Sequence, residues 1–483
     1  MARTKIVATI GPASNNPQTI RAMLAAGMTV ARINFSHGDH EAHADTVKLL
    51  RDIAREEGKA LAILADLQGP KLRLGHVKAG GMQLSQGDEI VLTPHPGQPA
   101  MIHMPHADLI SAASPGSRLV VGDGEVEFAV SEKKDDTLRC TVTVAGLLGS
   151  RKGIAAPGVS LGVSSMTSKD KVDFDLIRDL DFDYVALSFV RTAADIVELR
   201  HLMAAKNCDI PIIAKIEKAE AIENLEEIRD VVDGMMVARG DLGIEMLAEE
   251  VPLLQKRIIR TCNEVGIPVI TATQMLQSMV NHPRPTRAEA SDVANAILDG
   301  TDAVMLSGET ATGRYPVQAV LTMKQIAENV EKGFPYEIWR NRRQVQSTIR
   351  STVTQAISAA SCDVAEQVEA RAIVATTTSG YSARQIARHR PPIAIMAVSP
   401  SEQTQRRLSL VWGVDCLLVP NFYNTDDMLD ATVDALRPFK LDPGAKIVIT
   451  AGVPFGRTAT TNLIQVHSIK SNGELGSVDE SEQ

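Results

Sequence analysis

The chain has 483 residues, of which 44% are hydrophobic and 23% are charged, so its composition excludes a disordered or fibrous protein. Its formal net charge of -9 argues against a general binder of nucleic acids or membrane surfaces, because such proteins present a basic face. No signal peptide and no apolar run of about 18 residues or more is visible, so we expect a cytoplasmic protein. The five cysteines lack C-x-x-C spacing, which favours a reducing compartment over a disulfide framework or a zinc site.

Eight short apolar runs recur along the chain, with helical patterns between them. Because the runs are apolar on both faces, they predict parallel strands that are buried on each side. Capping-box patterns at Thr192 and Thr286 predict the starts of two of the helices. Strand–helix alternation repeated eight times predicts an α/β fold, a (β/α)8 TIM barrel built from residues 1–69 and 165–340. The runs are residues 5–11, 30–35, 60–67, 184–190, 211–217, 234–239, 268–274 and 303–309.

The pattern changes between the third and fourth runs. Residues 70–164 are punctuated by glycine, and apolar and polar residues alternate at 126–130 and 138–144 with a turn at 122–124. This segment is predicted to be an inserted all-β domain after barrel strand three. Its place in the chain puts it over the C-terminal mouth of the barrel, where a lid would sit.

A second strand–helix alternation follows the barrel. Residues 344–362 are predicted to form a helix, and 372–376, 393–398, 415–419 and 446–450 to form strands. We therefore expect a separate C-terminal α/β domain over residues 341–470. Residues 471–483 are polar and acidic and are predicted to be a mobile tail.

Several of the predicted barrel strands end in charged residues, at the mouth where TIM-barrel sites lie. Lys215 and Glu217 share one face of their strand, because alternate side chains do, and Asp241 follows the next strand. The two carboxylates are hard oxygen ligands suited to Mg2+ or Mn2+. A single charge at a strand end is more often an ion pair or a helix cap, and Ser307-Gly308-Glu309 alone is most simply a turn. The prediction of a site therefore depends on how many such ends converge.

The cations near these ends indicate the chemistry. A metal, a lysine and an arginine around one anion are typical of phosphoryl transfer, and five cations predict a substrate with several negative charges. Neither the P-loop motif nor G-x-G-x-x-G is visible, so a nucleotide would bind in another way. The five cations are Arg32, Lys71, Arg73, Lys152 and Lys215.

Seven strings of the chain match the motifs of a known family, in the same order. They are TKIV (4–7), IGPAS (10–14), RINFSHG (32–38), AKIE (214–217), MVARGDLG (236–243), TATQML (271–276) and LSGET (306–310). Through them the chain resembles the pyruvate kinases over nearly its full length, and the β insertion falls where that family has its B domain. The resemblance implies a glycolytic phosphotransferase that converts phosphoenolpyruvate and ADP to pyruvate and ATP with Mg2+.

The resemblance also implies roles for single residues. Glu217 and Asp241 would hold the divalent ion, Lys215 would stabilise charge on the phosphoryl group, and Arg32 would grip the phosphate. Backbone N–H groups near Gly240 and Asp241 would hold the substrate carboxylate. Thr273 matches the position at which the enolate is protonated through water. The remaining implied contacts are Ser307 and Glu309 on the substrate side, and Asn34, His37, Arg73 and Lys152 on the nucleotide side, where a second Mg2+ would arrive with ADP.

One departure from the family pattern concerns K+. Many members hold K+ with side chains matching Asn34, Ser36 and Asp66 and with the carbonyl of Leu67, and they carry Glu where this chain has Lys71. The resemblance is therefore to the K+-independent branch, in which the lysine ammonium supplies the positive charge.

The C-terminal domain resembles the family's regulatory domain. The loop Thr376-Thr377-Thr378-Ser379-Gly380 follows a predicted strand and precedes a helix, which suits the phosphate of a small-molecule effector, although an ordinary capped turn is an equal alternative. Residues 451–457 are predicted to form the opposing loop. The resemblance also implies a homotetramer.

Two other functions fit parts of the pattern. A metal-dependent aldolase or lyase would share the two carboxylates but would need neither the lid nor the C-terminal domain. A catalytically silent metabolite sensor would be expected to have lost Lys215, Glu217, Asp241 or Thr273, and all four are present.

Overall fold

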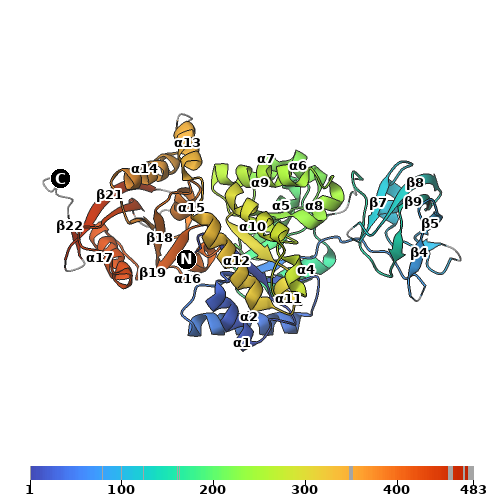
Figure 1. The fold of residues 1–483 in the computed structure, drawn as a ribbon, viewed down its shortest axis with the longest axis horizontal. Helices are drawn as coiled ribbons and strands as arrows, with labels where there is room; N and C mark the ends of the chain where they lie inside the picture. Colours follow the sequence, from blue (N-terminus) through green and yellow to red (C-terminus); the bar gives the residue numbers. More distant parts are fainter. Residues whose placement is uncertain are drawn as a thin grey trace.

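The computed structural model describes residues 2–78, 80–98, 101–122, 124–159, 162, 164–347, 352–454, 461–471 and 474–476. Figure 1 shows three parts in a row: the β-rich insertion at one end, the barrel in the middle and the C-terminal domain at the other end. No helix in these ranges combines the length and the apolar character needed to cross a membrane.

Eight parallel strands close into the predicted barrel, which confirms the fold class. Its β-strands are neighbours in the order β1-β16-β15-β14-β13-β12-β3-β2. Successive barrel strands therefore lie side by side, and β3 pairs directly with β12 although the insertion separates them in the sequence. The strands are β1 (Lys5–Thr9), β2 (Val30–Asn34), β3 (Ala62–Asp66), β12 (Tyr184–Leu187), β13 (Ile212–Ile216), β14 (Gly234–Ala238), β15 (Val269–Ala272) and β16 (Ala303–Leu306).

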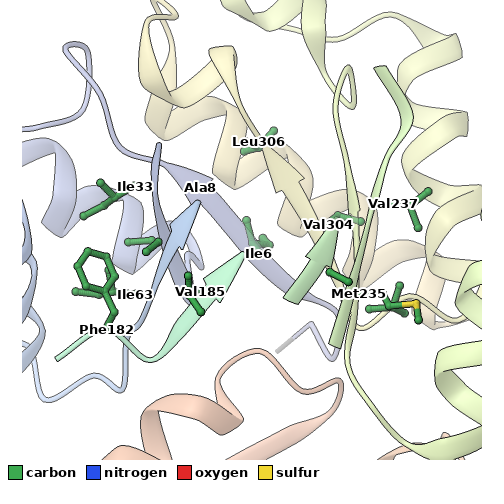
Figure 2. Close-up of a cluster of buried hydrophobic side chains, with 14 of the residues drawn as sticks. Ile6, Ala8, Ile33, Ile63, Phe182, Val185, Met235, Val237, Val304 and Leu306 are labelled. Atoms are coloured by element: carbon green, nitrogen blue, oxygen red, sulfur yellow. The ribbon is translucent and has the colours of Figure 1, made fainter. Parts of the chain in front are cut away.

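The strands read as continuous apolar runs because both of their faces are buried. In β1, Ile6 and Ala8 belong to the layer between the strands and the surrounding helices, whereas Val7 belongs to the interior of the barrel. Figure 2 shows side chains of the outer layer, including Ile6, Ile63 and Val185 from three strands. The alternation of the two layers is the period-two pattern of a strand, applied to a sheet with no solvent face.

Helices follow the strands around the barrel. Thr286 and Glu289 form the predicted capping box at the start of α10, with each side chain accepting the other residue's backbone N–H. The helices and 3-10 turn are α1 (Pro17–Ala26), α2 (His40–Glu56), α4 (Ser168–Asp179), α5 (Ala193–Ala205), α6 (Ala219–Glu223), α7 (Leu225–Arg229), α8 (Arg239–Glu245), α9 (Val251–Val265), η1 (Gln277–Val280), α10 (Arg287–Asp299), α11 (Gly308–Ala311) and α12 (Pro316–Glu331).

The insertion folds into β-structure around its own core. A six-stranded sheet has the order β11-β7-β8-β9-β5-β6, and β10 pairs with β4 beside it. The predicted alternating segments are its two longest strands, β8 and β9, which form a hairpin. The elements are β4 (Met82–Leu84), β5 (Glu89–Thr93), β6 (Ile102–His103), α3 (Ala107–Ala112), β7 (Arg118–Val121), β8 (Val126–Lys134), β9 (Thr137–Val144), β10 (Gly146–Leu148) and β11 (Ile154–Ala155).

The C-terminal domain contains a six-stranded sheet, order β19-β18-β17-β20-β21-β22. The four predicted strands are its parallel part, and the sequence analysis missed the antiparallel β21 and β22. Its elements are α13 (Tyr336–Ser347), α14 (Val353–Gln367), β17 (Ala372–Thr376), α15 (Tyr381–Ala387), β18 (Ala394–Ser399), α16 (Glu402–Leu408), β19 (Val414–Leu418), α17 (Thr425–Leu436), η2 (Arg437–Phe439), β20 (Lys446–Gly452), β21 (Thr461–Ile469) and β22 (Leu475–Gly476).

The prediction of one helix over residues 344–362 is wrong. Thr352 adopts an extended conformation, and its hydroxyl accepts the N–H of Gln355, so a new helix begins at Val353. The expected domain boundary at 340/341 falls inside α13. The predicted tail, residues 471–483, lies mostly outside the described residues.

The C-terminal domain closes the bottom of the barrel. Leu410, which follows α16, is fully buried among side chains of the barrel interior. Around it, the Tyr184 hydroxyl donates to the carbonyl of Arg407 at 2.7 Å, and Arg406 pairs with the buried Asp183 at 2.8 Å. The end of the barrel opposite the mouth is therefore sealed by a separate domain.

A buried ion pair joins the same two domains. Arg390 of the C-terminal domain is 1% exposed and contacts Asp302, at the start of β16, at 3.1 Å. Its guanidinium also donates to the carbonyl of Gly300 at 2.8 Å and lies 4.9 Å from the ring centroid of Trp412. A cation this deeply buried is stable only while these partners are present.

Replacing Arg390 with methionine should therefore lower the thermal midpoint by several degrees. Removing one partner of a buried pair costs about 3–5 kcal/mol, because the other charge is left uncompensated. The matched control is Arg21→Met, which removes an exposed arginine paired with Glu56 and Glu57, and it should leave the midpoint unchanged. Calorimetry of the three chains measures the effect, and equal midpoints for Arg390→Met and Arg21→Met would contradict the assignment.

Candidate functional site

A partly buried lysine lies between two buried carboxylates at the mouth of the barrel. The Lys215 ammonium is 2.9 Å from Glu217 Oε1 and 3.3 Å from Asp66 Oδ1, and both carboxylates are 1% exposed. Lys215 and Glu217 come from the end of β13, and Asp66 ends β3. The predicted strand ends are thus brought together, and Asp66 joins them as a direct partner of the lysine.

The charges in this group set one another's protonation. Burial alone would lower the pKa of Lys215, but Asp66 and Glu217 outweigh it and raise that pKa above its ordinary value. Burial opposes ionisation of Asp66, yet Lys215 and Arg32 hold its pKa below the usual range. For Glu217, burial prevails and, with Asp241 adding to it, raises the pKa. Lys215 is therefore charged at neutral pH, and a further cation beside Glu217 would favour the ionised form of that carboxylate.

The turn after β12 fixes both Lys215 and Glu217. Ser188 Oγ donates to the carbonyl of Leu67 at 2.7 Å and accepts from the Lys215 ammonium at 2.8 Å. The backbone N–H of Phe189 donates to Glu217 Oε2 at 2.8 Å, and Phe189 has a φ of 57°, which is strained for a bulky residue. Sequence reasoning missed Ser188 because it lies inside the largely apolar run 184–190 and carries no charge.

Arg32 is oriented by the same buried carboxylate. Its Nε and Nη2 atoms both lie 2.7 Å from Asp66 Oδ2, and Nη1 donates to the Thr9 hydroxyl at 3.0 Å. Asp66 therefore holds Arg32 on one oxygen and Lys215 on the other. This arrangement places two cations side by side at the mouth of the barrel, where an anion would be attracted.

Thr273 follows β15 in a left-handed conformation, with a φ of 68°. Its hydroxyl donates to the carbonyl of Ala272 and accepts the backbone N–H of Gly240, both at 2.7 Å. Arg239 supports this turn by donating to the carbonyl of Thr273 at 2.7 Å while pairing with Asp292. The N–H group predicted to hold a carboxylate is thus bonded to Thr273 in this structure, so a carboxylate would have to take it over.

Glu309 differs from its expected role of contacting substrate. It is fully buried, and its two oxygens accept the backbone N–H groups of Leu276 at 3.0 Å and Ser307 at 2.8 Å. A carboxylate used in this way ties the ends of β15 and β16 together. Ser307 is half-buried just before α11, beside this carboxylate.

Asp241 lies in the first turn of α8, half-buried, and faces a cleft between the barrel and the insertion. The cleft has a volume of about 280 Å3. Glu217 and Asp241 line it from the barrel, and Lys71, Arg73 and Lys152 line it from the insertion. Lys152 pairs with Glu125 at 2.7 Å, whereas Lys71 is exposed and has no ion pair within 4.0 Å among the described residues. The predicted metal ligands and three predicted cations therefore share one cleft.

The candidate K+ ligands already have protein partners here. Asn34 Oδ1 accepts the N–H of Ser36 at 3.1 Å, and the carbonyl of Leu67 accepts the Ser188 hydroxyl. The structure does not bring Lys71 into an ion pair with Asp66. His37 is exposed on the loop after β2, outside the cleft lining.

The loop from Thr376 to Gly380 forms a capped turn. The N–H of Gly380, with a φ of 79°, donates to the hydroxyl of Thr377 at 2.9 Å, and the Thr404 hydroxyl of α16 donates to the carbonyl of Thr378 at 2.6 Å. Thr378 and Ser379 are exposed. Of the opposing loop, residues 455–457 lie outside the described residues.

Comparison with known proteins gives consistent results. A family model described as "Pyruvate kinase, barrel domain" matches residues 1–320, and one described as "Pyruvate kinase, alpha/beta domain" matches residues 355–467. The chain is 45% identical to a pyruvate kinase of Geobacillus stearothermophilus and 47% identical to pyruvate kinase 2 of a Synechocystis species, covering 97% of this chain and 80% of each relative. The crystal structure of a pyruvate kinase from Cryptosporidium parvum superposes with a TM-score of 0.90 at 34% identity, over 96% of each chain.

The two cleft carboxylates should each be needed to bind a divalent cation. We expect Glu217→Gln and Asp241→Asn to weaken Mn2+ binding at least about tenfold, since each removes an anionic oxygen ligand. Glu220→Gln, which neutralises another carboxylate of the same cleft, is the control and should bind Mn2+ like the parent. Electron paramagnetic resonance of free Mn2+ gives the affinities.

The direction in which Mn2+ affinity changes with pH can also be predicted. Mn2+ binds the ionised carboxylate, and the pKa of Glu217 is raised from its ordinary value of 4.5. Protons should therefore begin to compete with Mn2+ at a pH above the usual glutamate range, and affinity should fall as the pH is lowered. An affinity that stays constant until the pH is well below 4.5 would contradict the raised pKa of Glu217.

Proposed function

The chain belongs to the pyruvate kinase family, and from that premise we propose how its residues divide the work of the reaction. The enzyme transfers the phosphoryl group of phosphoenolpyruvate to ADP and yields pyruvate and ATP, a step of glycolysis. The observation that carries our assignment is the Lys215 ammonium held between Asp66 and Glu217, beside Arg32. Two partly buried cations at the barrel mouth suit a phosphoryl group whose charge changes during transfer.

Members of the family generally use Mg2+, and we assign its protein ligands here to Glu217 and Asp241, which would also accept Mn2+. Both carboxylates face the cleft, and burial has raised the pKa of Glu217, which a bound cation would reverse. The described residues contain no group of three or more His, Cys, Asp or Glu side chains placed around one metal. Substrate oxygens and water would therefore complete the coordination, and the ion would supply charge neutralisation between the phosphate and the carboxylate.

We assign Lys215 to stabilising the phosphoryl group during its transfer. We assign Arg32 to binding the phosphate group of the substrate before the transfer. Lys215 is positioned by three neighbours, Asp66, Glu217 and Ser188, so little reorganisation would be needed as charge develops. Arg32 is fixed by Asp66 and Thr9. Preorganised donors of this kind stabilise a transition state more than they stabilise a mobile ground state.

We assign proton delivery to the enolate to Thr273 through a water molecule, and carboxylate binding to the backbone at Gly240 and Asp241. The bond from the Gly240 N–H to Thr273 Oγ1 links the two functions. A substrate carboxylate that took over this N–H would release the Thr273 hydroxyl toward the reacting carbon. Ser307 would support the substrate side, and Glu309 would act by positioning the ends of β15 and β16.

ADP is assigned to the side of the cleft formed by the insertion, next to Arg73 and Lys152, with Asn34 and His37 on the barrel side and a second Mg2+ on its phosphates. Gly69, with a φ of 67°, precedes the insertion and packs against the Phe189 ring, so that an added Cβ would lie 2.7 Å from it. This joint is where the lid would turn. Closure would exclude water, so that the phosphoryl group reaches ADP and is not hydrolysed.

K+ independence is proposed on the basis of Lys71. Its exposed ammonium lines the cleft without an ion pair among the described side chains, which leaves it available to the substrate. Lid closure would bring it toward the negative charges of Asp66 and the substrate phosphate.

Regulation, assembly and location are inferred from the family. We propose the 376–380 loop as an effector site for a phosphorylated small molecule, supported by its exposed Thr378 and Ser379 and by its bond to α16. A homotetramer is supported by the exposed apolar side chains of Leu253 and Ile338 on neighbouring helices, and light scattering would measure its mass. We assign the enzyme to the cytoplasm, where its substrates are found.

Replacing Lys215 with methionine should lower turnover at least about 10²–10³-fold, the usual effect of losing one donor to transition-state charge. The matched control is Lys171→Met, which removes a half-exposed lysine of α4 that pairs with Glu198. This variant should turn over like the parent. A coupled assay with phosphoenolpyruvate and ADP measures both. Full activity in the Lys215 variant would refute its role.

Steady-state kinetics in K+-free buffer test the role of Lys71. For the parent, we expect full activity without K+ and no more than a small change when K+ is added. For Lys71→Glu, we expect weaker phosphoenolpyruvate binding and an activity that depends on K+. Activity of the parent rising several-fold with K+ would sink the proposal. Repeating the assay with a panel of sugar phosphates tests the effector loop, because Ser379→Glu should abolish any activation by repelling the phosphate.

A further inference from the structure

A second cavity lies away from the barrel mouth, between the barrel and the C-terminal domain. Its volume is about 450 Å3, within the range of small-molecule sites, and its walls come from α9, α13 and the residues that follow α15. Figure 1 shows α13 at the boundary between the two domains. No residue assigned above to substrate, metal, nucleotide or effector lines this cavity.

The cavity concentrates positive charge in a chain whose net charge is -9. Four arginines line it, and its one carboxylate, Glu264, lies 3.8 Å from Arg260. Arg343 is neutralised by Asp363 at 2.8 Å and Glu366 at 2.7 Å. Arg342 lies 5.0 Å from the ring centroid of Trp339 and makes no ion pair within 4.0 Å in the described part of the chain. The positive charge of Arg342 therefore remains available on the cavity wall.

Two of the basic residues are deeply buried. Arg388 is 9% exposed, and burial lowers its pKa despite the nearby Glu264. His389 is 5% exposed, and burial together with Arg388 and Arg343 lowers its pKa well below the ordinary value, so its ring is neutral. Its Nε2 atom is buried without a hydrogen-bond partner among the described atoms. Leaving a buried polar atom unsatisfied is costly, and a ligand that bonded to it would recover that free energy.

We propose that this cavity binds a small organic anion, a carboxylate or a phosphate ester, at the junction of the barrel and the C-terminal domain. The planar guanidinium groups of Arg342 and Arg388 suit either anion, and His389 provides a further polar contact. Trp339 offers apolar surface for the body of the ligand.

Occupancy of this cavity should strengthen the junction between the two domains. Trp339 lies 5.6 Å from the guanidinium of Arg390, which makes the buried pair with Asp302. A ligand resting on Trp339 would therefore reinforce the packing around that pair. Since the ligand would bind only the folded state, it would also raise the thermal midpoint of unfolding.

Fluorescence gives a direct test, because the chain holds only two tryptophans. In Trp412→Phe, the remaining signal comes from Trp339 in the cavity wall. Citrate, a hexose 6-phosphate and inorganic phosphate would each be titrated at constant ionic strength. We expect citrate or the hexose phosphate to change the emission saturably. The one that binds identifies the ligand as a carboxylate or as a phosphate ester.

Variants locate the binding. Arg342 is exposed and is not needed for folding, so Arg342→Ala can be added to Trp412→Phe, where it should weaken ligand binding at least about tenfold. The control is Arg437→Ala, which removes an exposed arginine of the C-terminal domain and should leave ligand binding unchanged. In chains that keep Trp412, the ligand should raise the thermal midpoint of the parent and of Arg437→Ala more than that of Arg342→Ala. A saturable change that survives in Arg342→Ala, or no response to either organic anion, would overturn the proposal.

Discussion

The buried pairing of Asp66 with two cations is the constraint on which the rest of this site depends. One carboxylate, 1% exposed, holds Lys215 on one oxygen and Arg32 on the other. Its charge keeps both cations in place, and the surrounding strands keep the carboxylate in place. A charge in this position would be unstable alone, and it is stable here because three barrel strands end at the same level and bring their charges together.

The barrel could be predicted from the sequence because its strands are buried on both faces and appear as apolar runs. The same reasoning located Lys215, Glu217 and Asp241, since charges at the ends of such runs are conspicuous. It failed where a contact depends on distant residues. Ser188 lies in a largely apolar segment, and only the folded chain shows that it bridges Leu67 and Lys215. Glu309 looked like a substrate ligand, but both of its oxygens are taken by backbone N–H groups.

The junction between the barrel and the C-terminal domain could not be read from the sequence at all. Leu410 closes the barrel interior from another domain, and Arg390 finds its carboxylate 88 positions earlier, at Asp302. Local patterns carry no record of such pairs. The break between α13 and α14 could have been predicted, because Thr352-x-x-Gln355 is a pattern typical of a helix start. The prediction of one continuous helix overlooked it. The antiparallel β21 was missed because the regular strand–helix alternation ended before it.

The same junction gives α16 contacts at both of its faces. Thr404 reaches the 376–380 loop, and Arg406 and the Arg407 carbonyl reach the base of β12. The opposite end of β12 leads to Ser188 and Phe189, which hold Lys215 and Glu217. The candidate site and the C-terminal domain are therefore joined through one strand and one helix.

The central claim is that Lys215 acts on the phosphoryl group while Glu217 and Asp241 hold the metal. The most direct test compares two partial reactions in Lys215→Met: formation of ATP from phosphoenolpyruvate and ADP, and exchange of the methyl protons of pyruvate with deuterated water. The division of labour predicts that ATP formation falls by orders of magnitude while the exchange, which depends on the metal and on Thr273, falls far less. Equal loss of both reactions, or loss of the exchange alone, would contradict it.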